Sequence, residues 1–135
     1  MTQRGEASFQ VTSWDEKPYE EHEGGTKLTR AHVTQAYRGI IEGSGSVEYL
    51  MFHRADQTAN FIGLERITGA VAGRKGSFVA QHEGQYDEGI AKSRWFVVEG
   101  SGTLELTGMH GRGSYSVGHD GKASVQFEFD FDGVG

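Results

Sequence analysis

The sequence predicts an all-β fold, a single eight-stranded antiparallel up-and-down β-barrel. The chain has 135 residues, which is the length of one domain. It contains 21 glycines against one proline, with β-branched and aromatic residues spread from end to end. Apolar and polar residues alternate repeatedly, which is typical of strands and not of helices. We therefore treat residues 1–135 as one barrel domain, because a long meander removes its unpaired edges by closing.

Turn-forming Gly, Asp and Asn residues separate the alternating segments, and each segment is predicted to be a strand. The stretch Asp15–Gly25 carries Pro18 and an acidic cluster, so we predict a connection there. The eight predicted strands are Ala7–Trp14, Lys27–Arg38, Ser46–His53, Asn60–Ala72, Ser77–Tyr86, Ala91–Glu99, Thr103–His110 and Ser124–Phe131.

The hairpin at residues 63–84 determines which side chains point into the barrel. A loop centred on residues 74–75 aligns Glu65 with Gly84 and Ile67 with His82. In this register Glu65 and His82 lie on the same face as the apolar residues of the hairpin.

The outer face of the same hairpin supports this choice of register. It places Arg66 opposite Glu83, which is a favourable pair. A shift by one residue would instead bring Glu65 opposite Glu83, and like charges in that position are destabilising. Glu65 and His82 are therefore predicted to face the interior.

The neighbouring strands extend this inner face. The following turn pairs His82 with Trp95, and a loop at residues 99–102 pairs Trp95 with Leu106. The preceding strand brings Tyr49 onto the same face. Aromatic side chains are thus expected around the two polar residues.

Three inward-facing glycines interrupt the predicted interior. Gly63, Gly69 and Gly84 are expected to leave volume for a small-molecule pocket, and the alternative is that they relieve strand curvature. The remaining predicted interior residues are Tyr49, Met51, Phe61, Glu65, Ile67, Phe78, His82, Tyr86, Trp95, Leu104, Leu106, Phe127 and Phe129.

Glu65 and His82 are the candidate catalytic residues. A buried carboxylate is costly unless it is paired, so Glu65 should bond to His82 or Tyr49, or be protonated. Such a group suits general acid or base work, and Tyr49 or Tyr86 could polarise a carbonyl. The alternative is a network that only satisfies itself. The candidate ligand-binding residues are Tyr49, Phe61, Phe78, Tyr86, Trp95 and Leu106.

Composition argues against several other classes of protein. The chain has no cysteine, so it has neither disulfides nor a thiolate zinc site. A net charge of −6 without a Lys/Arg block argues against nucleic acid as a partner. No apolar run approaches the ~18 residues of a membrane span, and residues 1–10 lack the apolar core of a signal peptide, so we expect a cytoplasmic protein.

The six histidines show none of the spacings of local metal sites, so no metal and no cofactor are expected. A scattered metal site built from His82 and Glu65 is left as an alternative.

An ordered set of short motifs covers nearly the whole chain: TSWDE (12–16), KLTRAHVT (27–34), VEYL (47–50), GLERITG (63–69), GSFVAQHEG (76–84) and GSGTLELTG (100–108). On these motifs the chain resembles a bacterial family of small domains of unknown function, whose barrel is similar to the lipocalin-like barrel of allene oxide cyclase. Such cyclases work without cofactors by holding an unsaturated substrate in an apolar cavity. The resemblance implies the fold and favours a small-molecule cavity, although no cyclase-specific motif is present.

These observations lead to three functional hypotheses. The first is a barrel that binds a small apolar or aromatic molecule through one open end. The second is a cofactor-independent isomerase or cyclase in which Glu65 and His82 move a proton. The third is a structural or interaction protein with a fully packed barrel, which forms homo-oligomers through an edge strand or its acidic C-terminal segment.

Overall fold

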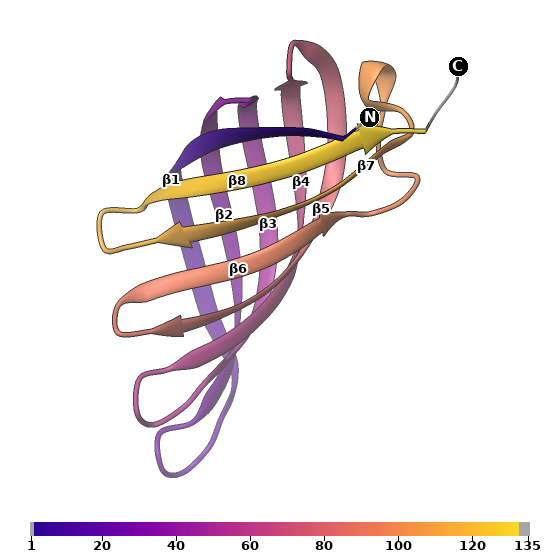
Figure 1. Cartoon of the computed structure of the whole chain (residues 1–135). Helices are drawn as coiled ribbons and strands as arrows, with labels where there is room; N and C mark the ends of the chain where they lie inside the picture. The colour runs from indigo at the N-terminus through magenta and orange to yellow at the C-terminus, as the bar shows by residue number, and fades with distance from the viewer. Residues whose placement is uncertain (1, 133–135) are drawn as a thin grey trace.

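Eight antiparallel strands close into one barrel in the order β1 to β8 (Figure 1). This computed structural model describes residues 2–132. Each strand pairs with the next and β8 pairs with β1, so the predicted up-and-down barrel is confirmed. The elements are β1 Gln3–Glu21, β2 Lys27–Gly39, β3 Ile41–His53, β4 Ala59–Val71, β5 Arg74–Asp87, β6 Ile90–Val97, the 3-10 helix η1 Leu104–Leu106, β7 Met109–Val117 and β8 Lys122–Phe131.

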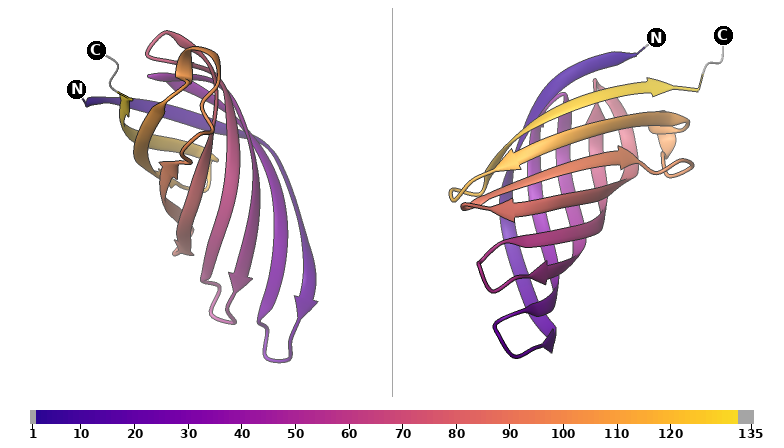
Figure 2. Two further views of the ribbon diagram at one scale, coloured as in Figure 1. Left: turned by 90° about the vertical axis from the view of Figure 1, so that its right-hand side faces the viewer. Right: turned by 60° about the horizontal axis from the view of Figure 1, so that its bottom comes forward.

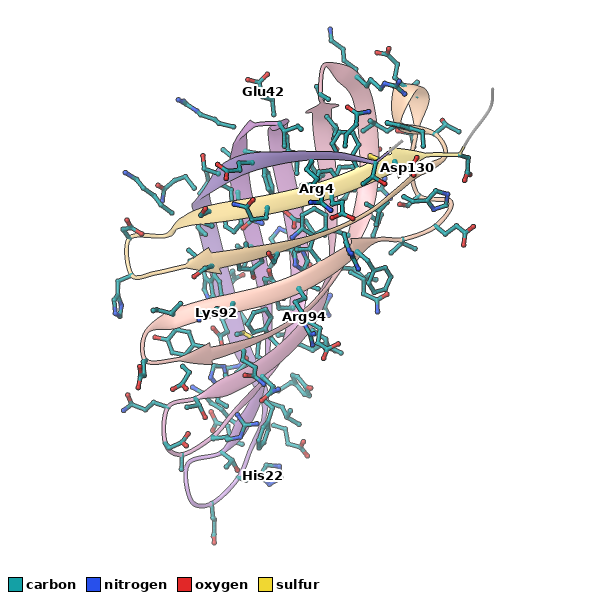
Figure 3. The ribbon with its side chains drawn as sticks, viewed as in Figure 1. Arg4, His22, Glu42, Lys92, Arg94 and Asp130 are labelled. Atoms are coloured by element: carbon teal, nitrogen blue, oxygen red, sulfur yellow. The ribbon has the colours of Figure 1, made fainter. Side chains whose placement is uncertain are left out.

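The barrel wall is deeper on one side than on the other. The β1–β2 and β3–β4 hairpins reach beyond the β5–β6 and β7–β8 hairpins at the lower end of the molecule (Figures 1 and 2). His22 lies at the tip of the lowest hairpin and Glu42 lies at the opposite, upper end (Figure 3). No helix within residues 2–132 is long and apolar enough to span a membrane.

The interior contains two hydrophobic clusters with a polar layer between them. The upper core includes Ile41, Ile67, Val71, Phe78, Trp95, Leu106, Phe127 and Phe129. The lower core consists of Ala31, Val33, Val47, Tyr49, Met51 and Phe61. Along their strands, Gln35 on β2 and Glu65 on β4 lie between residues of these two clusters, and both are buried.

Strand β8 shows how alternation builds the upper core. Phe127 and Phe129 are buried, as predicted, and the ring of Phe127 stacks on both Phe129 at 5.1 Å and Trp95 at 4.9 Å between centroids. A period of two places these rings on one face of the strand. The stacked rings fill the upper half of the barrel.

Strand β1 is longer than predicted. The expected connection at Asp15–Gly25 is wrong, because the strand continues to Glu21 in partnership with β2. A register shift between Pro18 and Glu20 accommodates the proline. Strand β8 pairs only with Gln3–Gln10, so the lower half of β1 has β2 on one side only, and such an edge tolerates proline.

The register of the β4–β5 hairpin differs from the predicted one by an even number of residues. The turn lies at residues 72–73, where φ is 50° and 83°, instead of at residues 74–75. This is the two-residue turn that matches strand twist. Glu65 therefore faces Ala80, and His82 faces Gly63. An even shift leaves every side chain on its predicted face, so both polar residues still point inward.

The predicted strand Thr103–His110 is wrong. Its first half forms η1 and the strand begins at Met109, so Trp95 faces Gly113 and not Leu106. Leu106 is nevertheless buried, because η1 turns it into the upper core, whereas Leu104 is 79% exposed. Gly111 and Gly113 occupy two inner positions of β7, so the apolar alternation that identifies a strand is interrupted there.

The inward glycines do not leave empty space, contrary to expectation. A Cβ atom at Gly63 would overlap the ring of Tyr49, and one at Gly84 would overlap the ring of Phe61. Gly69 lies directly against the backbone of β3. At Gly63 and Gly84 the missing side chain lets an aromatic ring from the neighbouring strand pack directly on the backbone.

The β4–β5 turn provides a test of this register. Gly73→Ala should cost roughly 1–2 kcal/mol of stability, because a side chain is disfavoured at positive φ even though the added Cβ would meet nothing within 4 Å. Gly118→Ala is the matched control, since it also meets open space but lacks a left-handed φ; it should change stability by less than about 0.5 kcal/mol. Urea denaturation measures both, and equal losses would contradict the assigned turn.

Candidate functional site

Glu65 and His82 form a hydrogen-bonded pair inside the barrel. The distance from His82 Nε2 to Glu65 Oε1 is 2.7 Å, and the two residues are 1% or less exposed. The predicted inward orientation and the predicted pairing are thereby confirmed. No group of three or more His, Asp or Glu side chains within residues 2–132 is arranged to hold a metal ion.

The second carboxylate oxygen of Glu65 accepts two further hydrogen bonds, both from β2. Gln35 Nε2 donates at 2.8 Å and the Tyr37 hydroxyl donates at 2.7 Å. Strand β3 lies between β2 and β4, and the carboxylate crosses it at Gly45, where a Cβ would overlap Glu65 Oε2. The missing side chain at Gly45 therefore permits a contact between strands that are not neighbours.

The imidazole of His82 connects the pair to β6. Ser93 Oγ lies 3.1 Å from His82 Nδ1, and its own hydroxyl is within reach of the backbone carbonyls of Glu83 and Arg94. A proton must lie between Nε2 and Glu65 Oε1, because two bare acceptors would repel at 2.7 Å. Glu65, His82 and Ser93 therefore form one continuous hydrogen-bonded chain across β4, β5 and β6.

Tyr49, the expected alternative partner of Glu65, bonds elsewhere. Its hydroxyl lies 2.8 Å from the hydroxyl of Tyr115 on β7. The rings of Tyr49 and Tyr115 also pack edge-on against the imidazole of His82, at 5.8 and 5.6 Å between centroids, so the tyrosine pair contacts His82. Burial, above all, raises the pKa of Tyr49 and of Tyr115 above the ordinary value, and the charge of Glu65 acts in the same direction. Both hydroxyls therefore keep their protons at neutral pH.

Below this network the barrel encloses a cavity of about 450 Å³ that opens at the lower end. On β2, β3 and β7 the lining residue furthest from the opening is polar, namely Gln35, Tyr49 and Tyr115. The apolar lining residues are Phe9, Val11, Val33, Met51, Phe61, Ala91 and Val117. We call the three polar residues the floor of the cavity.

The predicted site residues divide between the cavity and the upper core. Tyr49, Phe61 and Tyr86 line the cavity, and Tyr86 is at the rim with 36% exposure instead of in the interior. The other three predicted ligand-binding residues are buried in the upper core: Phe78, Trp95 and Leu106. Glu65 and His82 are not among the lining residues of the cavity, and the floor lies on the cavity side of them.

Four members of the network were missed by sequence reasoning. Gln35 and Tyr37 alternate with outward residues of β2, so period two alone could have placed them inside. Ser93 is two residues from Trp95 and is found by the same rule. Tyr115 could not be found, because its strand was placed too early in the chain.

A second polar cluster lies at the rim of the cavity. Glu16 accepts hydrogen bonds from Trp14 Nε1 at 2.9 Å and Thr29 Oγ1 at 2.7 Å, and His53 Nε2 lies 2.7 Å away. Partial burial raises the pKa of Glu16, but the three hydrogen bonds outweigh it and leave the pKa below its ordinary value. The rim therefore holds a carboxylate at neutral pH.

Comparison with known proteins agrees with this architecture. A family model described as "Protein of unknown function (DUF3224)" matches residues 5–129. The chain belongs to the DUF3224 family. A crystal structure of a DUF3224 protein with unknown function from Shewanella oneidensis MR-1 is similar, with a TM-score of 0.80 and 28% identity over 98% of this chain and 100% of that chain. No match is found among curated proteins.

Membership in the DUF3224 family confirms the resemblance to a family of small domains of unknown function. The match at residues 5–129 includes part or all of each of the eight strands, and the similar crystal structure is that of another protein of the same family. The likeness to allene oxide cyclase stays a prediction. The family name and the related structure describe no activity, so the chemistry of this DUF3224 protein follows from the network and the cavity.

Removal of the central carboxylate tests the network. Glu65→Ala should destabilise the protein by about 3–5 kcal/mol, because it leaves the buried donors of Gln35 and Tyr37 without an acceptor. Glu48→Ala on the adjacent strand is the control: Glu48 pairs with Arg30 and His32 on the exposed surface, and its loss should cost less than about 1 kcal/mol. Denaturant titration compares the two variants. A loss of stability for Glu65→Ala as small as that for Glu48→Ala would show that the network does not stabilise the fold.

The rim carboxylate predicts a pH dependence of stability. Because the folded-state pKa of Glu16 is below 4.5, its ionised form stabilises the protein above that pH, and this contribution disappears as pH falls through the folded-state pKa. Glu16→Gln should therefore be less stable than the native protein at neutral pH, and the difference should shrink in acid. Denaturation midpoints across the acid range measure this, and a constant difference would refute it.

Proposed function

We propose that this DUF3224 protein binds a small apolar or aromatic molecule in the lower half of the barrel. The observation that carries the proposal is the cavity of about 450 Å³, which is within the usual range of small-molecule sites. The surface of its wall is mainly apolar, as in most ligand pockets, and charged side chains such as Glu16, Lys27 and Arg54 line its rim. The opening at the hairpin end supplies a route of entry.

The contrast between the two halves of the barrel supports this function. The upper half is filled by stacked rings, with Phe78 and Phe127 nearly parallel at 6.1 Å. The same chain leaves the lower half hollow, although Tyr49 and Phe61 form an ordered edge-to-face pair there at 5.0 Å. A purely structural barrel would be expected to fill both halves.

Binding is favoured over the isomerase or cyclase hypothesis by the position of the acid–base pair. A general acid or base has to reach the proton that it transfers, directly or through one water. Glu65 and His82 are outside the cavity lining, with the hydroxyls of Tyr49 and Tyr115 on the side of the ligand. We therefore propose that the pair holds the floor in place and does not itself touch the ligand.

A neutral fluorescent probe tests the proposed function. N-phenylnaphthylamine should bind with one-to-one saturation and a Kd of about 10–200 µM, because its aromatic surface matches the cavity wall. Ala91→Trp, which fills the cavity, should abolish the fluorescence increase. Fluorescence titration of both proteins measures the effect.

Ala36→Trp is the control for this experiment, because Ala36 points outward from β2 and adds the same indole to the surface. It should bind the probe like the native protein. Thermal melting establishes that both variants are folded. Unchanged binding by folded Ala91→Trp would show that the probe binds outside the barrel and would overturn the proposal.

A further inference from the structure

The floor of the cavity contains a carbonyl oxygen that the protein does not use. Gln35 Nε2 donates both of its hydrogens, to the Tyr37 hydroxyl at 3.0 Å and to Glu65 at 2.8 Å, which determines the orientation of the amide. No donor within residues 2–132 bonds to the carbonyl oxygen of the same amide. Gln35 is only 3% exposed, yet it lines the cavity.

This oxygen must border the cavity. Every described side-chain polar atom that is sealed from both solvent and cavity has a hydrogen-bond partner. An acceptor without a partner is costly when it is sealed in the interior, but not where a ligand or water can reach it. The floor therefore presents one acceptor to whatever occupies the cavity.

The tyrosine pair that lines the same cavity offers a donor. Tyr49 and Tyr115 have two hydroxyl protons between them, and their mutual contact at 2.8 Å uses only one. No other acceptor within residues 2–132 bonds to either hydroxyl, so the other proton is available to a ligand oxygen. Because burial keeps both hydroxyls protonated, the pair can donate to a ligand without breaking its own hydrogen bond.

Both groups are held by one buried network. Glu65 orients the amide of Gln35, and the imidazole of His82, which is bonded to Glu65, packs against the rings of Tyr49 and Tyr115. Each link has its own partner, so the acceptor and the donor are in position before a ligand arrives. Such preorganisation lowers the entropic cost of binding.

We propose that the ligand of this cavity is an uncharged phenol or aromatic alcohol. Its hydroxyl group donates to the Gln35 carbonyl and accepts from the tyrosine pair, while its ring lies against Tyr49 and Phe61. A carbonyl ligand would leave the Gln35 oxygen without a donor, and a carboxylate would place negative charge against that oxygen. This inference rests on the proposed binding function and adds the chemical class of the ligand.

Three naphthalenes of nearly the same shape test the proposal on the native protein. The substituent is at the same ring position in all three. The hydroxyl group of naphthol donates and accepts hydrogen bonds, the ether oxygen of methoxynaphthalene only accepts them, and the methyl group of methylnaphthalene does neither. Displacement of N-phenylnaphthylamine at neutral pH, where naphthol is uncharged, gives the three affinities. We expect naphthol to bind about tenfold more tightly than methylnaphthalene, and methoxynaphthalene to bind less tightly than naphthol.

Two tyrosine variants locate the recognition. Tyr49→Phe should reduce the preference for naphthol over methylnaphthalene severalfold and leave the affinity for methylnaphthalene nearly unchanged. Tyr19→Phe is the matched control, because Tyr19 is exposed on β1 and is outside the cavity lining, and it should retain the full preference. Thermal melting of each variant shows whether it is folded.

The outcomes separate this inference from the proposed function. If neither the probe nor any naphthalene binds, the cavity is not a binding site and both proposals fail. If the three naphthalenes bind the native protein equally, cavity binding stands and recognition of a hydroxyl group is overturned. A preference for naphthol that survives Tyr49→Phe would contradict the assigned role of the tyrosine pair.

Discussion

The hydrogen bond between His82 and Glu65 is the constraint on which the interior of the barrel depends. A carboxylate inside a barrel costs several kcal/mol unless it is paired and its remaining lone pairs are satisfied. The remaining hydrogen bonds of the pair come from two other strands. Gln35 and Tyr37 on β2 donate to Glu65, and Ser93 on β6 bonds to His82. In a meander each strand is paired by its backbone only with its neighbours. The side-chain hydrogen bonds of the network also link strands that are not neighbours.

The same network explains why the barrel has one filled half and one hollow half. Above it, the stacked rings around Phe127 and the side chain of Leu106 from η1 are packed together in the upper core. Below it, the long hairpins of β1–β4 extend past the shorter strands (Figure 2). At this end the longer side of the barrel wall therefore has no strands opposite it. A satisfied polar layer forms a stable floor between the two, because it can face a cavity without exposing unpaired charge.

Most of the inner face was predictable from residues close together in the chain. Pairings such as Tyr49 with Gly63 and His82 with Trp95 were predicted correctly, because turn chemistry and charge pairs restrict the local register. Tyr115 was not predicted, because Gly111 and Gly113 interrupt the apolar alternation of its strand. The extension of β1 was missed because Pro18 is a turn signal in isolation, and only its position on a half-exposed edge makes it compatible with a strand.

The sequence by itself determined that the fold is an all-β barrel and that Glu65 and His82 face inward, because alternation with period two is a property of each strand alone. Only the tertiary structure decided which inward residues meet. Gln35 reaches Glu65 across Gly45, and Tyr49 meets Tyr115 across the barrel, through curvature and closure that no local pattern encodes. For the same reason the acid–base pair lies behind the cavity floor and not in the cavity: depth inside a barrel depends on the stagger of all eight strands.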